Sequence, residues 1–191
     1  MGRKVIVCVE VLNDHEQYTD LLLLRKQADS VNVKMEVEPK DRKHTEVGKV
    51  DFEHNNSDKG YLECRQNLIH RRRYSFNIFV KTFMQLPLFR FDSSGGRHWN
   101  PKNEELSLPE KAVKTPHFQK FNKDGISIAY RTEYLEENEE EILNDIQTSL
   151  HGYCNECNLE TNIGGQLTII RQINLLDYLP PNDPHSDAKF E

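Results

Sequence analysis

A strict alternation of apolar and polar residues at positions 31–38 is the feature that most constrains the fold of this chain. Val31, Val33, Met35 and Val37 are each followed by one polar residue, and a proline comes directly after the run. Because successive side chains of a β-strand point to opposite faces, this pattern predicts a strand with one buried face that ends at the proline. We expect further strands at residues 5–11, 47–53, 61–67, 74–80, 88–92, 116–121, 126–133 and 166–170.

Two capping boxes predict where helices begin. Asn13 precedes Glu16 by three residues, and Asn138 stands in the same relation to Glu141. An apolar stripe at helical spacing follows the second box and comprises Ile142, Leu143, Ile146, Leu150 and Tyr153. With the strands, these helices predict an α+β fold, in which a strongly twisted, mainly antiparallel sheet of about six to eight strands carries two helices on one face.

The length of the chain, 191 residues, favours one domain. Residues 177–191 contain several prolines and no periodic apolar face, a composition typical of a mobile tail. We therefore expect a single α+β domain over residues 1–176 and a mobile tail over residues 177–191.

The charge and apolar content of the chain narrow the classes of partner. Twenty-five basic and 31 acidic residues give a formal net charge of -6, which repels a phosphate backbone and disfavours generic nucleic-acid binding. No apolar run reaches the ~20 residues that span a bilayer, and the N-terminal sequence lacks a secretory pattern, so we expect a cytoplasmic protein without membrane contact. Four scattered cysteines predict reduced thiols rather than a disulfide framework.

The densest polar chemistry lies between residues 90 and 130. If the phenylalanines on either side of Arg90 face the core, period two brings Arg90 and Asp92 out together on the opposite face. A paired-glycine turn then returns His98 toward that face, and His117 lies on the strand expected at 116–121.

These four residues are candidates for catalysis. An arginine can hold an anionic oxygen with two hydrogen bonds while a histidine moves a proton, which is what phosphodiester cleavage requires. The alternative is structural: Arg90 and Asp92 form a surface ion pair of small energetic value, and His98 and His117 stabilise loops.

Other polar groups are candidates for binding. Arg71, Arg72 and Arg73 form the sole basic cluster, which either binds phosphate or is a solvated turn that keeps strands from pairing with other chains. Asn100, in an Asn-Pro turn beside the glycine turn, is a further candidate binding residue. The acidic run at 133–141 is explained by helix capping, or imitates nucleic acid toward a basic partner.

A weak metal candidate lies near the end of the second helix. His151, Cys154 and Cys157 are residue types that zinc prefers, but a fourth ligand would have to come from Cys8 or Cys64. The same positions continue the apolar stripe of the helix, so buried free thiols are the favoured interpretation. We expect no metal and no cofactor, and no Gly-rich phosphate loop, G-x-S-x-G or H-E-x-x-H motif is present.

The motif residues also resemble those of a known family. The patterns Arg90-x-Asp92, Gly96-x-His98-x-Asn100-Pro and Pro-His117, then a glycine and a helix that ends in Cys-Asn, resemble a family of small uncharacterised bacterial and prophage proteins. The resemblance covers roughly residues 21–159. Gln119 stands where the family pattern P-H-x-H has its second histidine, and the spacer before Pro116 is longer. The resemblance implies a shared fold and a mobile-element setting, and no activity.

Two functions remain open at this point. The first is a non-enzymatic binding or inhibitory protein that acts on a protein partner in the conflict between phage and host. The alternative is a small nuclease or toxin that uses His98 and His117 for proton transfer, with Arg90 on the phosphate.

Overall fold

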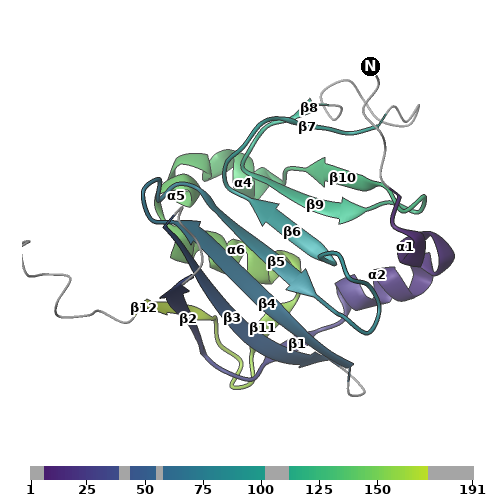
Figure 1. The fold of residues 1–191 in the computed structure, drawn as a ribbon, viewed down its shortest axis with the longest axis horizontal. Helices are drawn as coiled ribbons and strands as arrows, with labels where there is room; N and C mark the ends of the chain where they lie inside the picture. Colours follow the sequence, from purple (N-terminus) through teal and green to yellow (C-terminus); the bar gives the residue numbers. More distant parts are fainter. Residues whose placement is uncertain (1–6, 39–43, 55–57, 102–111, 172–191) are drawn as a thin grey trace, which may run out of the picture.

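The computed structural model describes residues 7–38, 44–54, 58–101 and 112–171 (Figure 1). The expected tail at residues 177–191 lies outside the described residues. The helices are α1 (Val9–Asn13), α2 (His15–Leu23), α4 (Glu133–Glu137), α5 (Glu139–Asn144) and α6 (Ile146–Glu156). The strands are β1 (Lys26–Ala28), β2 (Asn32–Val37), β3 (Thr45–His54), β4 (Asp58–Asn67), β5 (Tyr74–Phe79), β6 (Phe89–Asp92), β7 (His98–Trp99), β8 (Ala112–Val113), β9 (His117–Phe121), β10 (Ser127–Tyr130), β11 (Leu159–Thr161) and β12 (Thr168–Arg171).

One large sheet organises the fold and confirms the α+β class. Its main path runs β10-β9-β6-β5-β4-β3-β1-β11, and β2 joins β3 while β12 joins β2, so that ten strands are connected. The pairs from β3 to β10 are antiparallel, as expected, whereas β11 and β12 add to β1 and β2 in parallel. The sheet therefore has more strands than the six to eight expected, because the three-residue strands β1 and β11, which the sequence pattern did not indicate, extend it.

The strand predicted from the alternation at residues 31–38 is β2. Val33 and Met35 are buried as the alternation predicts, but Val31 and Val37 lie exposed at its two ends. The strands expected at 47–53 and 61–67 are confirmed as β3 and β4, which pair in antiparallel over their full ten residues, from Thr45 to His54 in β3. Residues 55–57, between the two strands, lie outside the described part.

Helix α6 covers one face of the sheet and completes the core (Figure 1). Tyr153 of α6 is fully buried, with ring centroids 5.4 Å from Phe76 and 5.3 Å from Phe89. Its hydroxyl donates a hydrogen bond of 2.9 Å to the carbonyl oxygen of Phe89. The buried hydroxyl group of Tyr153 thus has a hydrogen-bond acceptor in the backbone.

The expected strand at residues 5–11 is wrong over its described part. Val7 forms a single bridge with Ile126, and from Val9 the chain is helical in α1. The β-branched residues of this segment indicated a strand, but local propensity is overridden where no neighbouring strand continues the pairing. Helix α2 is capped by Asp14, which accepts a hydrogen bond from the backbone N–H of Gln17, and Asn13 instead ends α1.

The expected second helix consists of separate segments. Asp145 interrupts it and caps α6, because its side chain accepts a hydrogen bond from the backbone N–H of Gln147. Asn138 does not cap α5; its side-chain amide donates to the carbonyl oxygen of Tyr134. The apolar stripe nevertheless points to the core, since Ile142, Leu150 and Tyr153 are all buried.

No helix in the described part of the chain has the length and apolar character needed to cross a membrane. All four cysteines are buried and free, as expected from their number and spacing.

Candidate functional site

The face of the sheet opposite α6 carries the candidate site. Residues paired across neighbouring strands point to the same face, and the pairing links Glu63 to Asn77, Asn77 to Arg90, and Arg90 to Gln119. Phe89 and Phe91, which alternate with Arg90 and Asp92, are buried on the other side. The predicted alternation of this strand is therefore confirmed.

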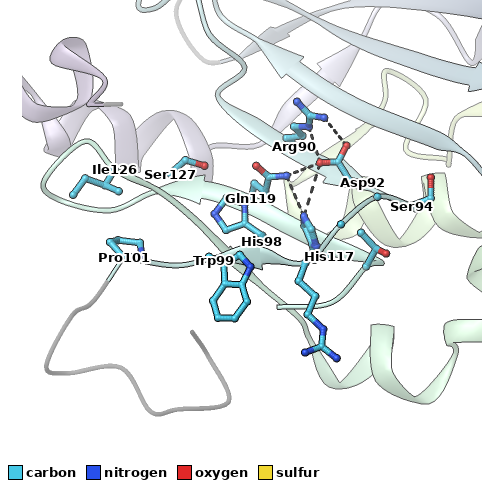
Figure 2. Close-up of a pocket in the computed structure, with 14 residues that line it drawn as sticks. Arg90, Asp92, Ser94, His98, Trp99, Pro101, His117, Gln119, Ile126 and Ser127 are labelled. Atoms are coloured by element: carbon cyan, nitrogen blue, oxygen red, sulfur yellow. Dashed lines mark hydrogen bonds and ion pairs between the residues drawn. The ribbon is translucent and has the colours of Figure 1, made fainter. Parts of the chain in front are cut away.

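Arg90 and Asp92 form a two-pronged ion pair on this face. The Nε and Nη2 atoms of Arg90 donate to the two carboxylate oxygens of Asp92 at 2.8 and 2.7 Å (Figure 2). The Arg90 side chain is 46% exposed and that of Asp92 is 14% exposed. The carboxylate is therefore held in place, while the guanidinium keeps one side open to solvent.

Gln119 connects this ion pair to His117. Its Nε2 atom lies 3.1 Å from Nε2 of His117 and also donates to the carboxylate of Asp92 (Figure 2). Nδ1 of His117 lies 3.3 Å from the carbonyl oxygen of Lys114. All three contacts are satisfied together when His117 is neutral, with its proton on Nδ1 and Nε2 accepting from the amide.

His117 is buried, with 3% of its surface exposed. Burial lowers the pKa of its imidazole, and the negative charge of Asp92, 3.9 Å from Nε2, opposes this shift without reversing it. His98 and Arg90 add smaller effects that lower the pKa further. The neutral form required by the hydrogen bonds is thus also the form favoured by the surroundings.

The loop between β6 and β7 brings His98 to this site. Ser93 fixes the start of the loop, since its hydroxyl accepts from the backbone N–H of Tyr74 at 2.8 Å. Gly95 has a φ of 142°, which side chains rarely permit, so glycine is needed for the turn. The His98 ring then lies edge-on to that of His117, with centroids 5.9 Å apart. The predicted return of His98 is confirmed.

Asn100 fastens the end of this loop to the edge of the sheet. Its side-chain nitrogen donates to the carbonyl oxygen of Ala129 at 2.8 Å, and its side-chain oxygen accepts from the N–H of Ala129 at 2.7 Å. The side chain is buried and pairs with the backbone as a neighbouring strand would. Asn100 thus positions the loop, and its expected role in binding stays a prediction.

These side chains line a pocket of about 540 Å³ (Figure 2). Its wall combines the strands β6 and β9 with the loop, and its charged, imidazole and indole groups belong to Arg90, Asp92, Arg97, His98, Trp99 and His117. All four residues expected to form a catalytic site therefore meet in one cavity. Trp99, the sole tryptophan of the chain, is 60% exposed beside it.

The basic cluster lies apart from this pocket. Arg71, Arg72 and Arg73 occupy the exposed turn before β5, and Arg72 pairs with Glu140 of α5 at 2.9 Å. Arg73 lines a neighbouring pocket of about 220 Å³ that shares Asp92 with the larger one. Of the three arginines, only Arg73 thus approaches the candidate site.

The weak zinc candidate is not assembled as a metal site. His151 lies 3.2 Å from the carbonyl oxygen of Leu167, while the thiols of Cys154 and Cys157 are buried in the core. Burial raises the pKa of both thiols, which opposes the thiolate form that zinc requires. Within the described ranges, no group of three or more His, Cys, Asp or Glu side chains is arranged to hold a metal ion.

Sequence reasoning missed several residues of the pocket, among them Gln119, Arg97 and Trp99. Gln119 lies two positions after His117 on the same strand, so period two alone places it beside His117. Arg97 and Trp99 flank His98 in the loop and have no periodic pattern. The signal for Trp99 was the presence of a lone large aromatic residue in a polar loop.

Comparisons with known proteins return no relative. The sequence matches no protein-family model, and no curated protein or solved structure is significantly similar to it. The functional argument therefore rests on the geometry of the pocket.

Proposed function

We propose that this protein is a non-enzymatic binding protein that docks a protein partner on the open sheet face, at the pocket beside Trp99. The observation that carries the proposal is the exposure of Trp99 next to a cavity lined by two arginines. Tryptophan and arginine are the residue types that most often dominate the energy of protein interfaces. A large apolar ring in water gains free energy when a partner covers it.

The way in which the backbone around Trp99 is held in place favours the same function. Its strand β7 pairs with β8, and the next residue, Asn100, is bonded twice to the backbone of β10. The ring is therefore presented by a fixed segment rather than a free loop end. Such preorganisation reduces the entropy lost on binding.

The hydrogen-bond network argues against proton transfer at rest. His117 is held neutral by burial, and its two ring nitrogens are already used by the side chain of Gln119 and the carbonyl oxygen of Lys114. A nuclease that uses two histidines needs one of them charged as the acid. His117 is poorly suited to that role.

The test is partner capture from a lysate of the natural host. We expect that Trp99→Ala reduces the amount of captured partner, whereas Ile163→Ala does not. Ile163 is a matched control because it is also apolar and is 80% exposed, in the turn after β11. Equal capture by wild type and Trp99→Ala would contradict the proposal.

A small nuclease or toxin is the second candidate, because Arg90, Asp92, His98 and His117 line one pocket. It predicts that wild type degrades RNA and that His98→Ala abolishes this degradation while the circular dichroism spectrum is unchanged. His70→Ala, in the exposed basic turn, is the control. RNA that stays intact with wild type would leave this candidate without support.

The biological setting that we propose is the conflict between phage and host. It is supported by the resemblance of the motif residues to the bacterial and prophage family alone. The identity of the captured protein tests it, since a bacterial defence or phage component is expected.

A further inference from the structure

We propose that the pocket beside Trp99 binds the carboxylate of a glutamate or aspartate side chain presented by the protein partner. The inference rests on the proposed function, because it names the group of the partner that the pocket receives. It is argued from the charges of the lining, from the unused donors of Arg90 and from the open loop between β6 and β7.

The lining has an excess of positive charge within an acidic chain. Among the described residues that line the pocket, Arg90 and Arg97 are cationic, and Asp92 is the one carboxylate. His117 adds no charge to this balance, because its surroundings favour the neutral imidazole and both of its ring nitrogens are used by Lys114 and Gln119. The pocket is therefore a local positive site on a protein with a net charge of -6, and a negative group is the complement that it favours.

Arg90 retains hydrogen-bond donors for such a group. Its pairing with Asp92 uses one hydrogen of Nε and one of Nη2, out of the five that a guanidinium carries. The side chain is nearly half exposed at the pocket. A second carboxylate can thus bind the open side of the guanidinium without displacing Asp92.

The loop offers backbone donors at the same place. In the described structure, the N–H groups of Gly95, Gly96 and Arg97 make no hydrogen bond to the protein. No atom lies within 4 Å of the position that a Cβ would take at Gly95 or Gly96, so an anion can approach both. Successive free N–H groups in a turn are a known anion-binding arrangement.

The surroundings of the pocket favour one carboxylate over a polyanion. On the neighbouring strands of the open face, Arg65 is paired with Glu38 at 2.7 Å and Lys49 with Glu63 at 3.2 Å. Their positive charge is thus neutralised, and the carboxylates repel further phosphates. A single acidic side chain needs only the pocket, and its methylene groups can lie on the exposed ring of Trp99.

The test uses two capped tripeptides, acetyl-Gly-Glu-Gly-amide and acetyl-Gly-Gln-Gly-amide, and reads the fluorescence of Trp99. Because Trp99 is the sole tryptophan, its emission reports on this pocket alone. We expect that the glutamate peptide shifts the emission and the NMR signals of the amides at 95–97, whereas the glutamine peptide does not. Arg97→Gln should weaken the affinity by about tenfold, the factor that ~1.4 kcal/mol represents, and Arg71→Gln in the distant turn should not.

Each other outcome overturns the inference. Equal binding of both tripeptides would show that the carboxylate is not recognised, and no response to either would show that the pocket does not take this group. Tighter binding of a single-stranded oligonucleotide in competition with the glutamate peptide would reassign the pocket to nucleic acid.

The failure of the inference is distinguishable from the failure of the proposed function. If the tripeptides do not bind but Trp99→Ala abolishes partner capture, the partner docks beside Trp99 as proposed, but the pocket does not bind a carboxylate. If the glutamate peptide binds but capture is independent of Trp99, the pocket recognises carboxylates and the partner docks elsewhere.

Discussion

Arg90 binds Asp92, its neighbour on the same face of β6, through two hydrogen bonds of 2.8 and 2.7 Å. This ion pair fixes the carboxylate, which also accepts a hydrogen bond from Gln119 and lies 3.9 Å from Nε2 of His117. One ion pair therefore orders a sequence of polar contacts that ends at a buried imidazole.

Removal of the negative charge of Asp92 should lower the pKa of His117 further. Asp92 is the main group that raises this pKa against the effect of burial, so Asp92→Asn leaves only the smaller effect of the Lys114 backbone to oppose desolvation. We expect the imidazole signals of His117 in an NMR titration to move to a lower midpoint pH than in wild type. Glu63→Gln, on the same face but two strands away from Arg90, should leave the midpoint where it is. A midpoint that rises in Asp92→Asn would refute the described network.

His117 should make the fold sensitive to acid. Its folded pKa lies below the ordinary value of about 6.5, so in the unfolded chain the imidazole takes up a proton more readily than in the folded protein. Its contribution to stability is present above pH ~6.5 and is lost as the pH falls from there through the folded pKa. Urea unfolding at a series of pH values should show a shallower loss in His117→Gln than in wild type over this window. Parallel curves for the two proteins would contradict the burial of a neutral imidazole.

Asn100→Ala should destabilise the protein and release the segment that carries Trp99. The substitution leaves the buried N–H and carbonyl groups of Ala129 without their partner, at a cost of about 1–3 kcal/mol. Urea denaturation gives the stability, and the fluorescence anisotropy of Trp99 gives the freedom of the ring. Asn144→Ala, whose amide lies on the exposed side of α5, should have a smaller effect. Unchanged stability and anisotropy in Asn100→Ala would remove the basis for a preorganised Trp99.

Lys26 should be a stabilising residue despite its burial. Its ammonium is fully buried and donates to the carbonyl oxygens of Leu22, Leu24 and Cys157, at the ends of α2 and α6. Lys26→Met keeps the length of the side chain but leaves these acceptors unpaired, so we expect a loss of about 1–3 kcal/mol in chemical denaturation. Lys34→Met, at an exposed position of β2, is the control.

Burial also lowers the pKa of Lys26 to about 8. Since the unfolded chain binds this proton up to an ordinary pKa of about 10.4, wild-type stability should rise with pH between the two values. The Met variant should lack this rise. If both proteins respond alike to pH in this range, the ammonium is not buried in solution.

The parts of the fold that followed from the sequence are those in which local alternation and long-range pairing agree. Residues 31–37 and 89–92 alternate strictly, and the structure buries Val33, Met35, Phe89 and Phe91 as that pattern requires. The parallel pair of β1 with β11 did not follow, because three-residue strands have no measurable period and these two are more than 130 residues apart. Residues 9–11 show the opposite error, since β-branched side chains there belong to a helix.

The candidate site was predictable to the extent that period two and a glycine turn determine direction. From these two signals we predicted that Arg90, Asp92, His98 and His117 lie close together, and all four line the pocket. They could not reveal that Gln119 completes the network or that Asn100 is used by the backbone of Ala129, because both depend on which strands become neighbours.

The most direct test of the account is amide hydrogen exchange of the protein with and without its captured partner. The backbone amides at 95–97 have no acceptor within the described structure, so they should exchange fast in the free protein and slowly in the complex. Protection at these amides and around Trp99 is the predicted result. Protection confined to α2 and α6, with the amides at 95–97 as fast as before, would contradict the claim that the partner docks on the open face of the sheet.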